Sequence, residues 1–257
     1  MMFKRKTWGF IFVVLAVMII LSGCESGSSG ELSDIKEVRK FAGSVGVGDF
    51  INVEVNLTDN NNLEGSYIDY EIRDLTDPSS IGEPVRIEFS RPGSDFYVMD
   101  DGDRFLMLGD DVLIATDKDE NGEDTGEEII TALKEMGSSE ANKISGKYNV
   151  ITSLEGAPGI VDFQSGGIVE IKIDLNGDGV YDSNEESFTA DYSYKDDYKA
   201  LEIVENNKGI FKHYGVFLDG DIGIFDSYME NDSGTLEGDG MSILVKQNSD
   251  SQLSDFA

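Results

Sequence analysis

Short runs in which apolar and polar residues alternate fill most of this sequence, and they restrict the fold more than any other feature. In one run Ile51, Val53 and Val55 alternate with polar residues, and similar runs recur as far as residue 246. A period of two places the apolar side chains on one face of a β-strand. Segments such as Gly-Asp-Asp between the runs are typical of tight turns. The sequence therefore predicts a mainly β fold built from antiparallel meanders.

The strand pattern is densest in the second half, where eight short runs suit a small barrel or sandwich. These runs span 147–153, 160–163, 169–173, 188–194, 200–204, 210–217, 222–228 and 242–246. The first half shows runs at 51–56, 70–72, 85–89, 96–99, 105–108 and 112–115. The second series opens on Ser145-Gly146-Lys147-Tyr148, which resembles the Gly-x-Trp start of lipocalin-like barrels, with Tyr148 in place of the tryptophan.

Two segments break the period of two and predict short helices. Apolar residues recur every three residues over 32–41, and at helical spacing over 129–136. Gly137 would end the second helix as its C-terminal cap. The apolar positions are Leu32, Ile35, Val38 and Phe41 in the first segment, and Ile129, Ile130, Leu133 and Met136 in the second.

Residues 174–185 form a loop with oxygen-bearing side chains at positions 1, 3, 5, 9 and 12 and Gly179 at position 6. Calcium binds six to eight oxygens at about 2.3–2.6 Å, so short acidic and amide side chains must converge on it from alternate positions. Gly179 allows the sharp turn that this convergence requires. The candidate ligands are Asp174, Asn176, Asp178, the carbonyl of Val180, Asp182 and Glu185.

Residues 117–128 repeat this spacing, and both windows resemble the EF-hand family of calcium-binding loops. The resemblance implies Ca²⁺ as the bound ion, and it covers these two windows alone. Asp124 departs from the family at position 8, where an apolar residue is usual. The second loop would use Asp117, Asp119, Asn121, the carbonyl of Glu123, Thr125 and Glu128, with Gly122 at the turn. Ordinary Asp/Asn/Gly turns in a chain rich in these residues are the alternative interpretation of both windows.

The N-terminus has the layout of a secretory signal. Lys4, Arg5 and Lys6 precede an apolar run from Trp8 to Leu21 that is short for a membrane span. The run ends in Leu21-Ser22-Gly23-Cys24, which resembles the lipobox of bacterial lipoproteins. The resemblance implies cleavage before Cys24 and acylation of that cysteine. A plain signal anchor is the alternative.

The same resemblance predicts a location. Glu25 follows the cysteine, and in lipoproteins of Gram-negative bacteria a residue other than Asp there implies transfer to the outer membrane. Cys24 is the one cysteine of the sequence, so neither a disulfide nor a cysteine nucleophile is expected in the rest of the chain. We therefore expect a cell-envelope protein held to the membrane by its N-terminal lipid.

These patterns divide the chain into five parts. The expected parts are a signal peptide at 1–23, a tether with a possible short helix at 24–42, a β-rich unit with the 117–128 loop at 43–137, an eight-strand β unit with the 174–185 loop at 138–247, and a polar tail at 248–257.

Charge and missing motifs narrow the function. The 51 acidic and 20 basic residues give a net charge of −31, which argues against binding to nucleic acid or to an anionic membrane surface. A single histidine, His213, excludes His-rich zinc sites and disfavours a Ser-His-Asp triad. No Gly-x-Ser-x-Gly, His-Glu-x-x-His or Walker motif is present.

The expected function is accordingly non-catalytic: a lipid-anchored, calcium-binding envelope protein with a structural or binding role. Two alternatives stay open. One is a lipocalin-like carrier, which requires an open apolar cavity. The other is a calcium-dependent hydrolase, which requires two convergent carboxylates with perturbed pKa values.

Overall fold

The fold is mainly β, as the alternation predicts. In the computed structural model, the described residues are 35–46, 49–59, 63–74, 82–92, 96–118, 124–152, 159–173, 186–205, 211–230 and 236–247. They form sixteen strands and one short helix, all within a compact unit over Ser33–Ala257. No helix among these residues is long and apolar enough to cross a membrane.

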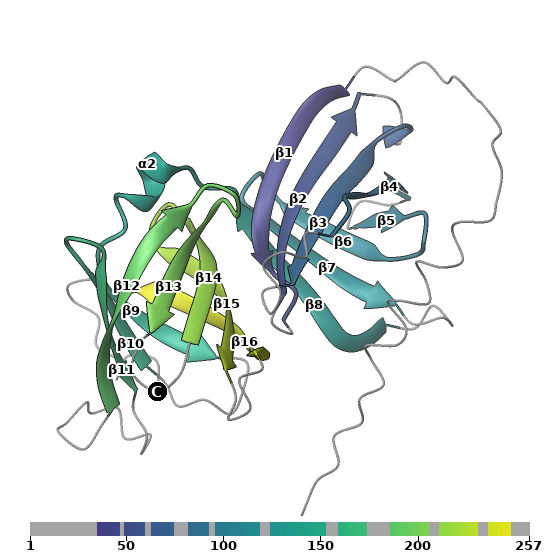
Figure 1. The fold of residues 1–257 in the computed structure, drawn as a ribbon. Helices are drawn as coiled ribbons and strands as arrows, with labels where there is room; N and C mark the ends of the chain where they lie inside the picture. The colour runs from purple at the N-terminus through teal and green to yellow at the C-terminus, as the bar shows by residue number, and fades with distance from the viewer. Residues whose placement is uncertain are drawn as a thin grey trace, which may run out of the picture. The chain divides into compact units, whose positions relative to one another are not determined.

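The first eight strands form a closed barrel in which each strand pairs with the next one along the chain (Figure 1). Strand β1 closes the barrel by pairing with β8, so that Ala42 faces Leu133 across the ladder. The strands are β1 (Ile35–Ser44), β2 (Asp49–Thr58), β3 (Tyr67–Asp74), β4 (Val85–Ser90), β5 (Tyr97–Met99), β6 (Arg104–Leu108), β7 (Val112–Lys118) and β8 (Asp124–Lys134).

The last eight strands form a second closed barrel of the same meander type (Figure 1). Here β16 returns to pair with β9. The strands are β9 (Gly146–Thr152), β10 (Gly159–Gln164), β11 (Ile168–Ile173), β12 (Glu186–Lys195), β13 (Ala200–Glu205), β14 (Phe211–Leu218), β15 (Ile222–Glu230) and β16 (Leu236–Lys246). All eight predicted strands of this half are confirmed, and the choice between barrel and sandwich is resolved as a barrel.

The predicted helix over 32–41 is wrong in its described part, because Ile35–Ser44 is strand β1. The ladder with β2 shifts register between Ile35 and Glu37, which indicates a bulge. A bulge adds one residue to the side-chain alternation of a strand. The bulge places Ile35 and Val38, three residues apart, on the same face, whereas Phe41 lies on the opposite face, where it is buried. The equal spacing of the three residues thus imitates a helical period, and the first barrel begins at Ile35 and not at residue 43.

The predicted helix over 129–136 is also wrong, because these residues continue strand β8 as far as Lys134. Ala132 belongs to the core of the first barrel, whereas Leu133 belongs to a core cluster shared with the second barrel. Both faces of this strand are thus apolar, which hides the period of two. Gly137 does not end a helix; it precedes the single short helix α2 (Ser138–Ala141), and its N–H donates to Glu140 Oε2 at 2.6 Å.

Aromatic rings fill the second barrel. Tyr148, at the position where the lipocalin-like pattern has tryptophan, is fully buried. Its ring contacts those of Phe163 and Phe217 at centroid distances of 5.5 and 5.1 Å. Phe225 packs on Phe217 at 5.4 Å. Edge-on packing of this kind is favourable for aromatic pairs beyond the area that they bury.

Two glycines of the second barrel make room for these rings. Gly215 pairs with Phe225 and Gly223 pairs with Phe217 across the β14–β15 ladder. A Cβ atom at either glycine would overlap the facing ring. The two Gly–Phe pairs therefore allow large rings to lie flat over the neighbouring strand.

Candidate functional site

The connection between β11 and β12 contains the candidate calcium window 174–185. The ladder between these strands is regular to its end, where Ile173 pairs with Glu186. The window between these two partners is 174–185, which is the whole predicted loop and nothing else. Residues 174–185, with all six candidate ligands, lie outside the described residues. The expectation that this loop joins two strands is confirmed by its flanks.

The second candidate loop, 117–128, lies partly within the ladder of its two strands. Thr116 of β7 pairs with Ile129 of β8, and the window between them is 117–128. The register then shifts, and Lys118 pairs with Asp124. Only residues 119–123 thus separate the two strands, so this loop is entered and left by strands and not followed by a helix. The side chains of the candidate ligands in 117–128 lie outside what the structure describes, as does Cys24.

The two loops occupy different hairpins of their barrels. The 117–128 window joins the last two strands of the first barrel, and the 174–185 window joins the third and fourth strands of the second barrel. A duplication that had copied a loop together with its barrel would place both in the same hairpin. The described topology therefore gives no support to a common origin of the two loops.

Within the described residues, no group of three or more His, Cys, Asp or Glu side chains is placed to hold a metal ion. His213 lies on β14, where its Nδ1 is 2.7 Å from Ser227 Oγ. In a serine-hydrolase triad the nucleophile contacts Nε2, and Nδ1 is held by a carboxylate. The His213–Ser227 pair lacks that arrangement and is a cross-strand hydrogen bond.

Two carboxyl groups of the second barrel have opposed pKa shifts. Burial raises the pKa of Asp226 to about 7, although hydrogen bonds from Ser44 and from the backbone favour the carboxylate. Burial also acts on Glu202, but hydrogen bonds from Lys195 and Tyr214 outweigh it and lower the pKa of that carboxyl. An acid and a base of this kind are a pattern of glycoside hydrolysis.

These two groups do not form a catalytic cleft. Tyr214 of β14 pairs with Glu202 on one side and with Asp226 on the other, so its ring stands between them. The Tyr214 hydroxyl donates to Glu202 Oε1 at 2.6 Å. Asp226 is 0% exposed, so a substrate has no access to it. The pair therefore lacks the open geometry that hydrolysis requires.

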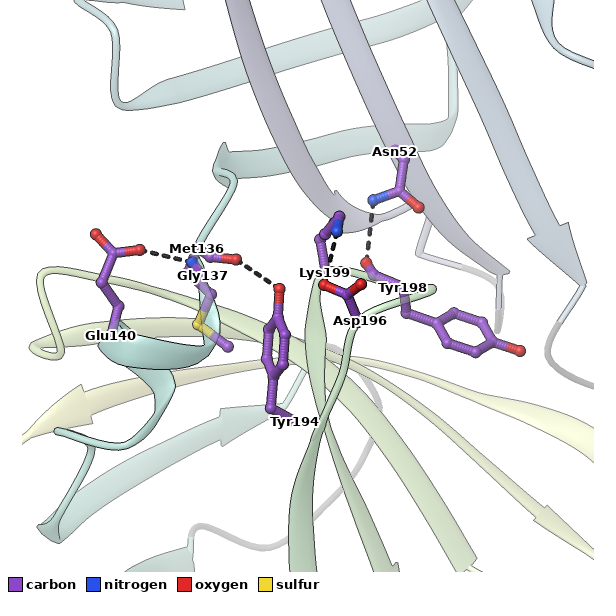
Figure 2. A network of polar contacts seen from close by, with 8 residues as sticks. All are labelled: Asn52, Met136, Gly137, Glu140, Tyr194, Asp196, Tyr198 and Lys199. Carbon is purple, nitrogen blue, oxygen red and sulfur yellow. Dashed lines mark hydrogen bonds and ion pairs between the residues drawn. The ribbon is translucent and has the colours of Figure 1, made fainter.

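A polar seam connects the two barrels (Figure 2). The Asn52 amide of β2 donates to the carbonyl of Tyr198 at 3.1 Å, and the Tyr194 hydroxyl donates to the carbonyl of Met136 at 3.0 Å. Arg73 of β3 lies over the Tyr198 ring at 4.7 Å from its centroid. The contacts of Tyr198 with Asn52 and Arg73 hold the turn between β12 and β13, residues 196–199, against the first barrel.

A groove of about 260 Å³ runs along this seam. Its three basic side chains all have acidic partners within 3 Å. These ion pairs are Lys40–Glu54 at 2.9 Å, Arg73–Glu71 at 2.8 Å and Lys199–Asp196 at 2.7 Å. The Nε atom of Arg73 and the Oδ1 atom of Asn52 are buried without a hydrogen-bond partner among the described residues. The groove therefore combines paired charges with buried polar atoms that have no protein partner among the described residues.

Sequence reasoning missed Asp226, which is one acid among 51. The sequence around Asp226 does contain a pattern that indicates burial of this residue. Ile222 and Ile224 line one face of β15, and Gly223 and Phe225 line the other. A strand that is apolar on both faces is buried on both, so an acid at its centre must be buried as well.

No protein-family model matches the sequence, and no curated protein matches it. Among solved structures, one similar chain is a protein of unknown function of the DUF3598 family from Nostoc punctiforme, known from a crystal structure. The two chains share 10% sequence identity, and the match covers 83% of this chain and 95% of that one, with a TM-score of 0.23. A likeness at this level carries no inference about function.

Proposed function

We propose that this chain is a lipid-anchored, calcium-binding protein of the bacterial envelope with a structural, non-catalytic role. The observation that carries the proposal is the bracketing of the 174–185 window by the cross-strand pair Ile173–Glu186. The 117–128 window lies partly within its ladder, because Lys118 pairs with Asp124, so the proposal for this second loop rests on its ligand spacing.

This bracketing suits calcium binding for a geometric reason. Antiparallel partners have Cα atoms about 4.5–5.5 Å apart. Ile173 and Glu186, the residues on either side of the 174–185 window, are such partners. In EF-hand loops positions 1 and 12 bind the same ion, so the ends of the loop must be close. The hairpin provides this closeness, which paired helices provide in the family.

A structural role for the ion follows from charge. The chain has a net charge of −31, and each window gathers several acids at one hairpin. Without a cation these carboxylates repel one another and oppose closure of the loop. At a free calcium concentration ten- to a hundredfold above the dissociation constant, each site would add about 1.4–2.7 kcal/mol to the free energy of unfolding. That is a substantial part of a typical total of about 5–15 kcal/mol.

The proposed location fits weak calcium sites. Acylation at Cys24 would hold the protein outside the cytoplasm, at the outer membrane if the host is Gram-negative. Extracellular loops function with dissociation constants of about 10⁻⁴–10⁻³ M, because calcium is plentiful there.

Metabolic labelling with a fatty acid tests the anchor: the wild-type protein should incorporate the label and a Cys24→Ser variant should not. Equal labelling of the two proteins would refute it.

The carrier alternative gains no support from the described residues. Tyr148, Phe163, Phe217 and Phe225 are buried in mutual contact inside the second barrel. An apolar ligand would have to displace this packing. We therefore propose calcium binding without carriage.

Thermal unfolding with and without calcium tests the structural role. The melting temperature of the wild-type protein should rise when chelator is replaced by millimolar calcium. A variant with Asp174→Ala and Glu185→Ala should lose most of this rise. Asp191→Ala serves as a matched control, because it removes an exposed acid of β12 outside both windows. If the melting temperature of the wild-type protein is the same in chelator and in millimolar calcium, the structural role is refuted.

A further inference from the structure

Strands β14 and β15 pack on two sides. Their inner face carries Phe217 and Phe225, and their outer face carries the paired residues Val216 and Ile224. The outer residues belong to one core cluster with residues of the first barrel, so the barrels meet in an apolar interface. The first barrel contributes Ala42, Phe50 and Leu133 to this cluster, and the segment between β8 and α2 contributes Met136.

Asp226 lies on this outer face, next to Ile224 in the alternation of β15, and it is 0% exposed. Ser44 of β1, also 0% exposed, donates from Oγ to Asp226 Oδ2 at 2.5 Å. The Oδ1 atom of Asp226 has no hydrogen-bond partner within the described ranges. A carboxylate needs donors at both oxygens when it is buried, whereas a neutral carboxyl needs fewer. Hydrogen bonds from the Ser44 hydroxyl and from the backbone of Ser227 and Gly46 favour the carboxylate, but burial outweighs them, so the site favours the neutral form.

The groups that act most strongly on Asp226 include no basic side chain. Asp49, at the start of β2, is the charged group that acts most strongly on Asp226, and it is itself acidic. On β14 the paired residue is Tyr214, whose hydroxyl is already directed to Glu202. On β16 the paired residue is Met241. Strand β8 adds the apolar Leu133 to the same cluster.

The lysine that bridges Glu202 is bound away from Asp226. Lys195 bridges Glu202 at 2.8 Å, on the far side of Tyr214 from Asp226. Ionisation of Asp226 would therefore place an unpaired charge in an apolar interface, beside a second acid. An unpaired buried charge is strongly unfavourable, and separation of the surfaces is the direct way to hydrate it.

We propose that Asp226 is a proton-operated latch between the two barrels, closed when its carboxyl is neutral and bonded to Ser44, and opened when the carboxyl ionises. The latch is independent of calcium, since neither residue lies in an acidic window. Each barrel closes its own ladder, so the interface can open without loss of strand pairing.

The direction of the pH effect follows from linkage. In the docked form the pKa of Asp226 is raised to about 7, and in water an aspartate has a pKa of about 3.9. A raised pKa in the docked form means that docking is strongest below pH 4 and is lost progressively as the pH rises toward 7. Between pH 5 and pH 8 the docking equilibrium should weaken about a hundredfold.

Hydroxyl-radical footprinting of the full chain, read by mass spectrometry, measures this opening. Phe50 and Tyr214 are buried by the interface, whereas Phe105 and Phe163 are buried inside the barrels. From pH 5 to pH 8 oxidation of Phe50 and Tyr214 should rise several-fold, with no change at Phe105 and Phe163. An Asp226→Asn variant, which cannot ionise, should show no rise at any of these residues.

A second variant and an infrared measurement test separately whether ionisation of Asp226 opens the interface. A Ser44→Ala variant retains the ionisable group, so its interface should still open with rising pH. Infrared spectra of the wild-type protein should show a protonated carboxylic acid at pH 5 that disappears by pH 8. The proposal is overturned if oxidation of Phe50 and Tyr214 is independent of pH, if it rises equally in Asp226→Asn, or if Phe105 and Phe163 become oxidised together with them.

Discussion

Phe163 of β10 lies at the centre of the aromatic cluster that fills the second barrel. It is 2% exposed, and its ring meets those of Tyr148, Tyr192 and Phe217 at centroid distances of 5.5, 5.1 and 5.6 Å. All three contacts are nearly perpendicular, which is a favourable geometry for aromatic pairs. Replacing Phe163 with alanine should therefore remove a large part of the packing inside this barrel.

The expected loss can be bounded. A buried phenylalanine removes about 150–250 Å² from water, which at about 25 cal/mol per Å² corresponds to about 4–6 kcal/mol. Alanine keeps the Cβ atom, and measured losses for Phe→Ala in protein cores are about 3–5 kcal/mol. We expect Phe163→Ala to lower the free energy of unfolding by about 4 kcal/mol, and Phe163→Leu to lower it much less.

Urea unfolding followed by far-ultraviolet circular dichroism measures this loss. The alanine variant should also contain a dry apolar cavity, so a small apolar probe such as benzene should stabilise it and leave the wild-type protein unchanged. A loss below about 1 kcal/mol would contradict a filled interior, because it falls short of any core truncation of this size. Equal stabilisation of both proteins by benzene would do the same, and it would restore the carrier alternative.

Two further changes test the interface and the cross-strand packing. Because the raised pKa of Asp226 stabilises the protein at low pH only, Asp226→Asn should gain about 4 kcal/mol relative to the wild-type protein between pH 4 and pH 8, measured by urea unfolding; a constant difference between the two proteins would contradict the shift. Gly215→Ala should cost about 1–3 kcal/mol, because its Cβ would overlap the Phe225 ring. At Gly137 the nearest atom to an added Cβ is Glu140 Oε2 at 3.7 Å, so Gly137→Ala should cost much less in the same assay; equal losses would refute the overlap.

The sequence predicted the second barrel well because its strands alternate cleanly. In β10 and β11 the buried residues Val161, Phe163, Val169 and Ile171 are separated by polar or half-exposed ones. That pattern is local, and a period of two can be read without knowledge of the partners. The register of each strand, and closure of the barrel through β16 and β9, depend on residues far apart and could not be predicted.

The two wrong helices have distinct physical causes. In β1 the register shift near Glu37 puts Ile35 and Val38 on one face three residues apart, and Phe41 of the opposite face follows at the same spacing. In β8 one face packs inside the first barrel and the other packs on the second barrel, so apolar residues occur on both faces. Neither the bulge nor the docking of a second barrel is encoded in local periodicity. The same docking buries Asp226, which explains why its role was not predicted.

The two candidate calcium windows are the opposite case, because their spacing of oxygen-bearing side chains is visible in the sequence. The structure adds that the paired residues Ile173 and Glu186 bracket the 174–185 window. The spacing alone could not show whether the ends of each loop meet. That depends on strand register, since a hairpin shifted by two residues would hold Asp174 and Glu185 at unequal heights on the ladder.

Calorimetric titration with calcium tests the proposed function most directly. It compares the purified wild-type protein with a variant that carries Asp174→Ala and Glu185→Ala. The wild-type protein should bind two ions, and the variant should bind one, with the remaining site abolished by Asp117→Ala and Glu128→Ala. If the first variant takes up as much calcium as the wild-type protein, the 174–185 loop is an ordinary acidic turn and the proposed function is wrong.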